Sequence, residues 1–319
     1  MLCCAMNKAV LHDHLDGGLR PTTAKELAVK LNYTPLIDVD DTSKFFDRSE
    51  CSSLEEYLEA FTHTIALMQS YENLVRIAYE AAEDMHNNGI TLYESRYAPF
   101  FSVNEHLSPV DVLNAINTGF EEAENTFGMK CGLILCGMRH DAENVKLVEE
   151  LALANSDKII GFDIAGPELN FRPSLFSKTF KNIADAGINI TIHAGEGDDV
   201  SSIQEALDNG AQRIGHGVRI IEDVDVQNNK IGKTAAYILD NKIPLEICIT
   251  SNLHTNMYET AEKHPINQLV ELGFQVSLNT DNRLMSNTTI KEEIDVAKIA
   301  GVKDPEDLLV KSASYSFLN

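Results

Sequence analysis

The sequence predicts a single-domain (β/α)8 barrel over residues 1–319, with a helical insertion after the first strand. Eight short apolar segments alternate with longer stretches of helical periodicity along the whole chain, and no linker rich in Pro or Ser divides them. Most of these segments are apolar at nearly every position, as expected of parallel strands buried on both faces. The same pattern leaves a doubly wound sheet open as an alternative.

Strand and helix patterns follow one another in regular order. The strands are predicted at Ala9–His12, Ile90–Tyr97, Met129–Met138, Ile159–Ile164, Ile188–His193, Arg213–His216, Leu245–Thr250 and Gln275–Asn279. Helical patterns between or after them include Ser108–Phe127, Asn144–Asn155, Ser174–Ala186, Val200–Asn209 and Thr288–Ala300. Four of the patterns are followed by a glycine at which a left-handed residue would end the helix, namely Gly128, Gly187, Gly210 and Gly301.

The connection between the first two strands is too long for one helix. It contains helical patterns at Ala24–Leu31 and from Leu54 towards Asn88, with an acidic stretch near Asp38–Asp41 between them. We expect approximately residues 32–75 to form a helical lid over the barrel mouth. Its apolar side chains would be Phe45, Phe46, Leu54, Tyr57, Leu58 and Phe61. Alternatively, these residues only pack the inserted helices together.

The charge of the chain excludes several classes of partner. It carries 26 Lys and Arg against 49 Asp and Glu, a net charge of −23. Such a surface repels phosphate backbones and anionic lipids, so neither nucleic acid nor membrane is expected as a partner. The six cysteines form no close framework, and we find no signal-peptide pattern and no apolar run of bilayer length. We expect a cytoplasmic protein that is a monomer or a weak homo-oligomer.

Chemically capable side chains gather where the predicted strands end. They are His12-Asp13-His14, Ser95-Arg96, Arg139-His140-Asp141, Asp163 with Glu168, His193 with Glu196, His216, Ser251-Asn252 and Asp281-Asn282. In a barrel these ends all face one mouth, so the side chains would converge on one pocket.

Four of these residues suit a metal ion. His12 and His14 point to the same side of an extended strand, and His193 and Asp281 end two other strands. Three imidazole nitrogens and a carboxylate oxygen favour Zn²⁺, although Fe²⁺, Mn²⁺ or Co²⁺ could use the same ligands. The alternative is that the histidines are hydrogen-bonded core residues.

Two further residues could move protons. Glu196 lies in a turn flanked by glycines, and a desolvated carboxyl there could hold a raised pKa and donate a proton at neutral pH. His216, between two glycines, could accept a proton from water or orient it. The alternatives are an ordinary loop glutamate and a structural histidine.

Taken together and in order, these segments resemble the adenosine deaminases of the metal-dependent amidohydrolase superfamily. The resemblance covers nearly the whole chain, and its blocks are 11–17 (LHDHLDG), 94–99 (ESRYAP), 161–168 (GFDIAGPE), 191–196 (TIHAGE), 213–217 (RIGHG), 250–252 (TSN) and 277–281 (SLNTD). It implies hydrolysis of adenosine and 2′-deoxyadenosine to inosine and 2′-deoxyinosine with release of ammonia, as in purine salvage.

The resemblance also implies roles for individual residues. One zinc ion would be held by His12, His14, His193 and Asp281. Catalysis would use Glu196, which protonates purine N1, His216, which orients and deprotonates the attacking water, and Asp281. The substrate would meet His14, Asp16 at the ribose 5′-hydroxyl, the Gly166 N–H at N3, and Asn282 at N7.

Two positions depart from the family pattern. Many members carry Asp where this chain has Asn282; we expect the amide to keep the N7 contact because it donates a hydrogen bond at any pH. Relatives usually continue into a further helical tail, whereas this sequence ends at Asn319, as a natural terminus or a truncation.

Other functions remain alternatives. Adenine deaminases tend to carry Glu at the position of Asp16, which favours a nucleoside here. A 5′-modified substrate such as methylthioadenosine stays open, as does a catalytically inactive binding protein on the same fold. The complete set of metal and proton-transfer residues argues against the inactive protein.

Overall fold

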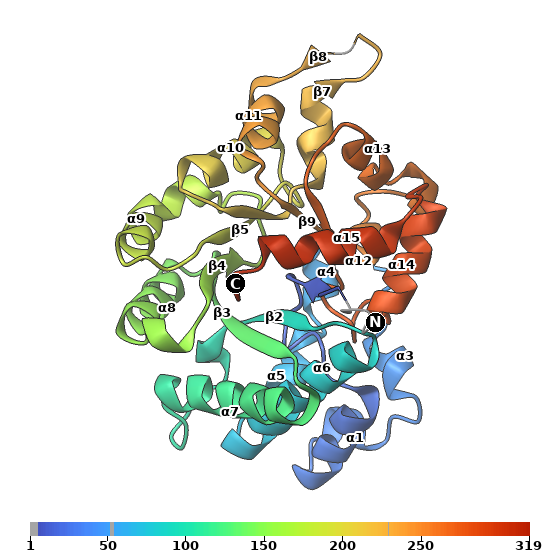
Figure 1. Ribbon diagram of the computed structural model, residues 1–319. Helices are drawn as coiled ribbons and strands as arrows, with labels where there is room; N and C mark the ends of the chain where they lie inside the picture. The colour runs from blue at the N-terminus through green and yellow to red at the C-terminus, as the bar shows by residue number, and fades with distance from the viewer. Residues whose placement is uncertain (1–5, 52–53, 229) are drawn as a thin grey trace, which may run out of the picture.

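A closed barrel of parallel strands forms the centre of the molecule (Figure 1). The computed structural model describes residues 6–319 apart from 52–53 and 229. The barrel strands are β1 (Ala9–Val10), β2 (Leu92–Tyr97), β3 (Lys130–Met138), β4 (Gly161–Ala165), β5 (Thr191–Ala194), β6 (Arg213–His216), β9 (Leu245–Ile247) and β10 (Val276–Leu278). Two four-stranded sheets are joined by parallel bridges between Phe162 and Ile190 and between Asp13 and Asp281. The predicted eight-stranded barrel is confirmed.

Helices surround the strands as an outer layer (Figure 1). They are α1 (Pro21–Lys30), α2 (Thr34–Ile37), α3 (Thr42–Phe46), α4 (Leu54–Leu58), α5 (Phe61–Leu67), α6 (Tyr71–Asn87), α7 (Pro109–Phe127), α8 (Ala142–Ala154), α9 (Ser177–Asp185), α10 (Val200–Asp208), α11 (Lys233–Asn241), α12 (Ile249–His254), α13 (Ile266–Glu271), α14 (Ile290–Ile299) and α15 (Pro305–Ser312). Within the described residues, no helix is long and apolar enough to cross a membrane.

Helix α7 shows how local sequence sets these boundaries. Ser108 and Asp111 form a reciprocal capping box at its start, and Gly128 ends it with φ 70°. The other three predicted stop glycines also have positive φ, at 74°, 85° and 95°. The glycine signals in the sequence therefore predicted these helix ends correctly.

The prediction for the seventh strand is wrong at its end. Strand β9 stops at Ile247, and Ile249 and Thr250 begin helix α12 although both are strong strand formers. The chain turns at Cys248, whose carbonyl accepts a hydrogen bond from the Asn252 N–H at 3.0 Å. Tertiary context thus overrides the local β preference.

A short antiparallel hairpin lies outside the barrel and was not predicted. It pairs β7 (Val224–Asp225) with β8 (Lys230–Ile231) and projects beyond α11 (Figure 1). Its strands are two residues each, which is too short to give a clear alternation in the sequence.

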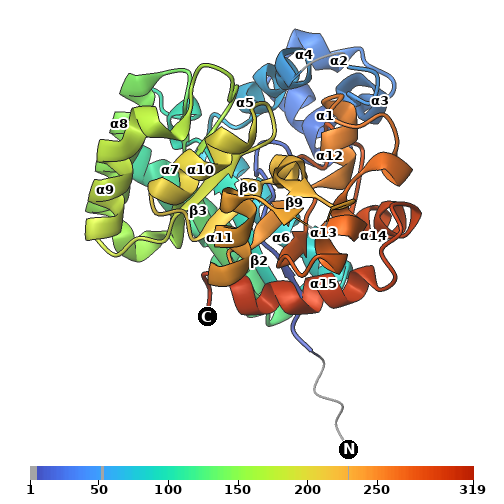
Figure 2. The same ribbon diagram turned by 90° about the horizontal axis from the view of Figure 1, so that it is seen from above.

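The two ends of the barrel are covered differently (Figure 2). Helices α2 to α5 lie at one end and α15 at the other. Beside α15, Tyr315 and Leu318 pack on Ala9, Leu11 and Leu92, where the strands begin. The Phe317 N–H donates to the buried Glu94 at 2.6 Å. Since this end is closed by the chain itself, the opening lies at the carboxyl ends of the strands.

Glu293 is a buried carboxyl that joins α14 to the chain at the start of α12. It accepts hydrogen bonds from the Thr288 hydroxyl at 3.1 Å and from the Thr250 N–H at 3.4 Å. Burial raises the pKa of Glu293 to about 7, and these hydrogen bonds offset the effect only partly.

We predict that Glu293→Gln stabilises the protein increasingly as the pH rises. Because the pKa of Glu293 is higher in the folded state, its stabilising contribution is complete below the unfolded-state pKa. That contribution is lost as the pH rises through about 7, by at most about 1.4 kcal/mol per pH unit. The difference in Tm between variant and parent should therefore be larger at about pH 8 than at about pH 5. Glu292→Gln, exposed in the same helical turn, is the control. A constant difference for Glu293→Gln would contradict the prediction.

Candidate active site

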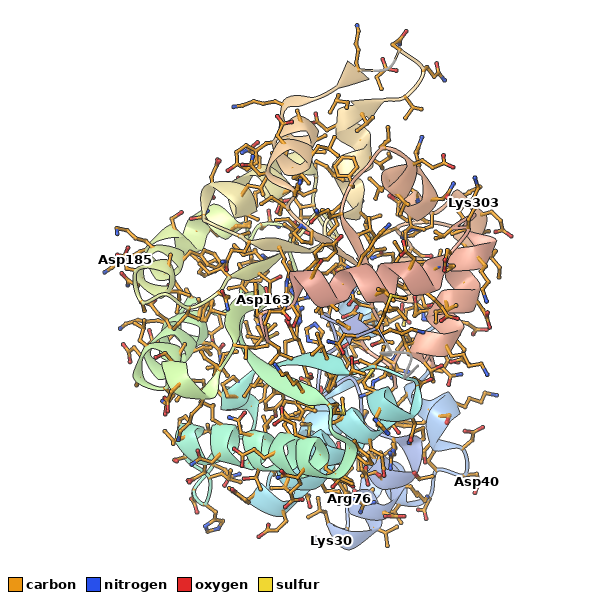
Figure 3. All side chains as sticks on the ribbon, viewed as in Figure 1. Lys30, Asp40, Arg76, Asp163, Asp185 and Lys303 are labelled. Carbon is orange, nitrogen blue, oxygen red and sulfur yellow. The ribbon has the colours of Figure 1, made fainter. Side chains whose placement is uncertain are left out.

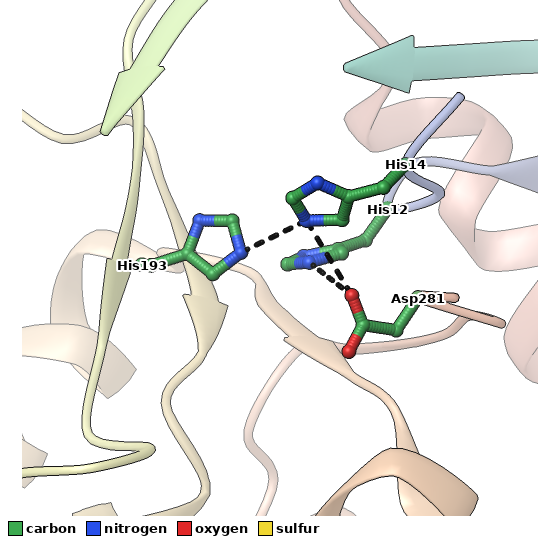
Figure 4. Close-up of side chains that lie close together, drawn as sticks. All are labelled: His12, His14, His193 and Asp281. Carbon is green, nitrogen blue, oxygen red and sulfur yellow. Dashed lines mark hydrogen bonds and ion pairs between the residues drawn. The ribbon is translucent and has the colours of Figure 1, made fainter. Parts of the chain in front are cut away.

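Three histidines and one aspartate meet at the open end of the barrel (Figure 4). Potential ligand atoms of His12, His14, His193 and Asp281 all lie within 4.8 Å of one another. His12 Nε2 and His14 Nε2 are each 3.4 Å from Asp281 Oδ1, and His14 Nε2 is 3.2 Å from His193 Nε2. Within the described part of the chain, the buried His12 Nε2 has no hydrogen-bond partner. An orphaned imidazole nitrogen aimed into such a cluster fits a bound metal ion.

Backbone pairing brings the ligands together across the whole length of the chain. The His14 N–H donates to the Asp281 carbonyl at 2.7 Å, and the Asp281 N–H donates to the His12 carbonyl at 3.0 Å. Asp281 itself has φ 56°, a left-handed conformation that is uncommon for a residue other than glycine. Closing the barrel therefore also assembles the cluster.

Charged side chains behind the cluster orient the rings of His12 and His193. His12 Nδ1 lies 2.9 Å from Glu246, and His193 Nδ1 lies 2.8 Å from Asp163. Because carboxylates only accept, each Nδ1 carries the proton and each Nε2 lone pair faces the cluster. Arg96 contacts Asp163 at 2.6 Å and Glu246 at 2.8 Å. Figure 3 shows Asp163 near the centre of the barrel, whereas Asp185 lies at the periphery.

The pKa values of Asp163, Glu246, His14 and His193 agree with this arrangement. Burial alone would raise the pKa of Asp163 and of Glu246, but Arg96 and the facing histidines lower both below their ordinary values. Burial lowers the pKa of His14 and of His193, which favours the neutral rings that metal binding requires.

Sequence reasoning named Arg96 and Asp163 only as strand-end residues and overlooked Glu246. A signal for Glu246 exists in the sequence, because it is a charged residue in the middle of the apolar segment Leu245–Ile249. A charge in a buried strand needs partners, and such a position predicts a buried ion pair.

Glu196 lies beside the cluster in the turn after β5. Burial raises its pKa well above the ordinary 4.5, and the charges of Asp281 and Glu168 add to the effect, although Arg139 opposes it. Its Oε2 lies 3.7 Å from His216 Nε2. Burial therefore favours the protonated form of this carboxyl, which is the form that could donate a proton.

Glu168 holds the turn that carries Glu196. Its carboxylate accepts hydrogen bonds from the backbone N–H groups of Gly195, Glu196, Gly197 and Asp198, at 2.7, 3.0, 2.8 and 3.1 Å, and from the Ser202 hydroxyl. One side chain thus provides the hydrogen-bond acceptor for four backbone N–H groups of the turn. The sequence placed Glu168 at a strand end but gave it no role.

A cavity of about 280 Å³ opens over the cluster. Its polar wall contains every predicted site residue except the deeper His12, namely His14, Asp16, Gly166, His193, Glu196, His216, Asp281 and Asn282. Asp16 Oδ1 and Asn282 Oδ1 are buried and have no hydrogen-bond partner among the residues that the structure describes. Burial raises the pKa of Asp16 to about 7. Both side chains therefore retain hydrogen-bonding capacity towards a ligand.

The apolar wall of the cavity comes partly from the inserted helices. Tyr57 and Leu58 of α4 and Phe61 of α5 line it, and the lid itself stays a prediction. Phe46 is instead fully buried in the core, and Phe45 packs against the core, so neither belongs to the wall. The Leu54 side chain lies outside the described residues. Lid motion stays a prediction.

A (β/α)8 barrel with three histidines and an aspartate around one point at its strand ends is typical of metal-dependent hydrolases. The family model described as adenosine deaminase matches residues 7–318. The chain belongs to the adenosine deaminase family.

Individual relatives agree with this assignment. "Adenosine deaminase 1" of Streptomyces coelicolor is 42% identical over 303 residues, which are 90% of this chain and 76% of the relative. Two solved structures share the fold. An adenine deaminase from Arthrobacter aurescens has a TM-score of 0.87 at 22% identity, and the match covers 98% of this chain and 94% of the deaminase chain. An amidohydrolase from Burkhoderia ambifaria with bound Zn has a TM-score of 0.84 at 23% identity, and the match covers 99% of this chain and 86% of the amidohydrolase chain.

We predict that Glu168→Gln destabilises the protein by about 3 kcal/mol, because an amide cannot accept from four N–H groups and its own NH₂ opposes them. Chemical denaturation monitored by circular dichroism measures the change in free energy of unfolding. Glu121→Gln, on an exposed position of α7, is the matched control. Equal stabilities of the two variants would refute the anchoring role of Glu168.

Proposed function

We propose that this chain is a zinc-dependent hydrolase that deaminates adenosine and 2′-deoxyadenosine to inosine and 2′-deoxyinosine. The observation that carries the proposal is one cavity whose wall combines the His14–His193–Asp281 cluster with the buried Glu196, whose pKa is raised by burial. Membership of the adenosine deaminase family supports the choice of substrate.

The metal site would use His12, His14, His193 and Asp281. When bound, zinc would act as a Lewis acid that lowers the pKa of a water molecule and supplies a nucleophile at neutral pH. The unpartnered Nε2 of His12 and the neutral rings of His14 and His193 support this ligand set. Fe²⁺, Mn²⁺ or Co²⁺ would be accepted by the same atoms.

Glu196 and His216 would act on the two reactants. Glu196 donates its proton to purine N1, which makes C6 more electrophilic. The water oxygen then bonds to C6, and the bond from C6 to the exocyclic nitrogen breaks. The proton from Glu196 remains as inosine N1–H, one water proton leaves with the nitrogen as ammonia, and the other water proton restores Glu196. His216, whose Nε2 is 3.7 Å from Glu196 and 4.0 Å from Asp281, orients the water between them.

Four further contacts would select the substrate. The ring of His14 borders the purine, the Gly166 N–H donates to N3, and the Asn282 amide donates to N7. Asp16, with one unpartnered oxygen, accepts from the ribose 5′-hydroxyl. A carboxylate there would repel a 5′-phosphate, so a nucleoside is favoured over a nucleotide. Cytoplasmic location, expected from the composition, stays a prediction.

The proposal is tested by mixing metal-loaded protein with adenosine and following the loss of its ultraviolet absorbance, with and without a chelator. Adenosine and 2′-deoxyadenosine should react, and adenine and methylthioadenosine should react at least about tenfold more slowly. Faster turnover of adenine or methylthioadenosine would replace the substrate assignment. Absence of any change with a metal-loaded sample would refute the enzyme and favour a binding protein.

We predict that Glu196→Gln keeps its metal but loses turnover, by about 10²–10⁴-fold, because an amide has no acidic proton for N1. Metal content measured by elemental analysis separates the two roles. Glu205→Gln, on α10 beyond the same loop, is the control and should stay near parental activity. Loss of the metal from Glu196→Gln would mean that this residue is a ligand.

We predict that Asp163→Asn weakens metal binding by about 10–100-fold, because the carboxylate that fixes the His193 ring is replaced by a neutral amide. Competition with a chromophoric chelator measures the affinity. Asp185→Asn, at the exposed end of α9, provides the matched change of charge. Unchanged affinity in Asp163→Asn would show that the pair with His193 does not tune the ligand.

A further inference from the structure

The side of His216 that faces away from the cluster contacts a chain of buried polar groups. His216 Nδ1 lies 3.1 Å from Asn252 Nδ2, and Asn252 Oδ1 lies 3.2 Å from His264 Nε2. His264 Nδ1 in turn accepts a hydrogen bond from the backbone N–H of Ile266 at 3.2 Å. Asn252, His216 and His264 are all buried, with at most 3% of any of them exposed. None of the roles proposed above uses Asn252 or His264.

The direction of each hydrogen bond in this series of buried groups follows from the last one, in which the Ile266 N–H contacts His264. A backbone N–H can only donate, so His264 Nδ1 is the unprotonated nitrogen of the ring. Burial lowers the pKa of His264 to about 3, which keeps that ring neutral with its proton on Nε2. His264 Nε2–H therefore donates to Asn252, and the atom that receives it must be the amide oxygen.

The orientation of the Asn252 amide is fixed at both of its ends. With Oδ1 towards His264, the NH₂ group faces His216 Nδ1 at 3.1 Å and the Met257 sulfur at 3.4 Å. A flipped amide would point its NH₂ group at the Nε2–H of His264, which is a clash of two donors. Asn252 thus donates to His216, whose Nδ1 accepts.

The opposite side of His216 agrees with this direction. Its Nε2 faces the Glu196 carboxyl at 3.7 Å and the Asp281 carboxylate at 4.0 Å. A proton on Nε2 points at the Asp281 carboxylate, whereas a lone pair on Nε2 would face the lone pairs of that carboxylate.

We propose that Asn252 and His264 are positioning residues that hold His216 in its Nε2–H form, so that His216 donates a hydrogen bond to the attacking water instead of accepting the water's proton. This inference rests on the proposed function for its meaning, but the tautomer itself is a property of the protein alone. It departs from the sequence-based expectation that His216 deprotonates the water. With His216 as a donor, the acceptors on this side of the cavity are the carboxylate of Asp281 and that of Glu196 once it has given its proton to N1.

The direct test is ¹⁵N NMR of the histidine rings in the metal-loaded protein without substrate. Long-range ¹H–¹⁵N spectra distinguish the two neutral tautomers, and His216→Gln identifies the His216 signals. We expect a protonated Nε2 and an unprotonated Nδ1 in the parent. A protonated Nδ1 would overturn the inference, even if the protein deaminates adenosine. Because no substrate is present, a protein inactive on adenosine that shows the Nε2–H form would support the inference while refuting the proposed function.

Asn252→Asp replaces the amide donor next to His216 with a carboxylate acceptor of nearly the same shape. A carboxylate accepts from both histidines, so the His216 proton should move to Nδ1 or the ring should become doubly protonated. We expect kcat to fall by about 10²-fold while KM changes less than about threefold, as for loss of one preorganised contact in the transition state. Asn241→Asp, exposed at the end of α11, is the matched control. Parental ring signals and parental kcat in Asn252→Asp would overturn the proposal.

Two substitutions of His264 test whether its hydrogen bond to Asn252 is needed, because one of them keeps a donor and the other does not. Gln at this position can place an amide N–H near the Nε2 position of His264, and Leu cannot donate. We therefore expect His264→Gln to keep the His216 tautomer and at least about a third of kcat, and His264→Leu to lose about tenfold or more of kcat with KM unchanged. Equal loss in both variants, with the parental tautomer kept in both, would overturn the role of His264.

Discussion

The pairing of Arg96 with two carboxylates is the interaction on which the rest of the site depends. Arg96 is fully buried and contacts Asp163 at 2.6 Å and Glu246 at 2.8 Å. Each carboxylate also holds the Nδ1 proton of a histidine of the cluster. Charges at this depth are stable only as a complete set, because removal of one partner leaves another buried and unpaired. Arg96 therefore fixes the direction of two imidazoles that it does not touch.

Glu246 extends the same network to the closed end of the barrel. One oxygen contacts Arg96 and His12, and the other lies 2.7 Å from Arg213 and 3.0 Å from the Thr191 hydroxyl. Arg213 pairs with Glu94 at 2.6 Å, and Glu94 accepts the N–H of Phe317 near the end of the chain. The segment that closes one end of the barrel is thus linked through buried charges to the cluster at the other end. Charged groups of opposite sign thus pair along the whole route between the two ends of the barrel.

Sequence reasoning found the barrel and the cluster because both repeat a local signal. Apolar segments mark the strands, and His12, His14, His193 and Asp281 each follow one of them. The roles of Glu168 and Asn252 were not predicted, since they act through backbone groups and amide orientation that depend on distant segments. For the same reason the end of β9 was misplaced: the local preference of Ile249 and Thr250 for strand carries no information about the turn at Cys248.

The histidines of this site are directed by two opposite kinds of partner. Where a lone pair must face the cluster, as in His12 and His193, Nδ1 is held by a carboxylate that only accepts. Where a proton must face the cavity, as we infer for His216, Nδ1 meets an amide that donates. Carboxylates suit the first task because their charge also makes the ring a stronger ligand. A neutral amide suits the second because an acceptor at Nδ1 would draw the proton away from the reacting side. The residue behind the ring therefore differs between His12 and His193, which we propose as metal ligands, and His216, which we propose acts on water.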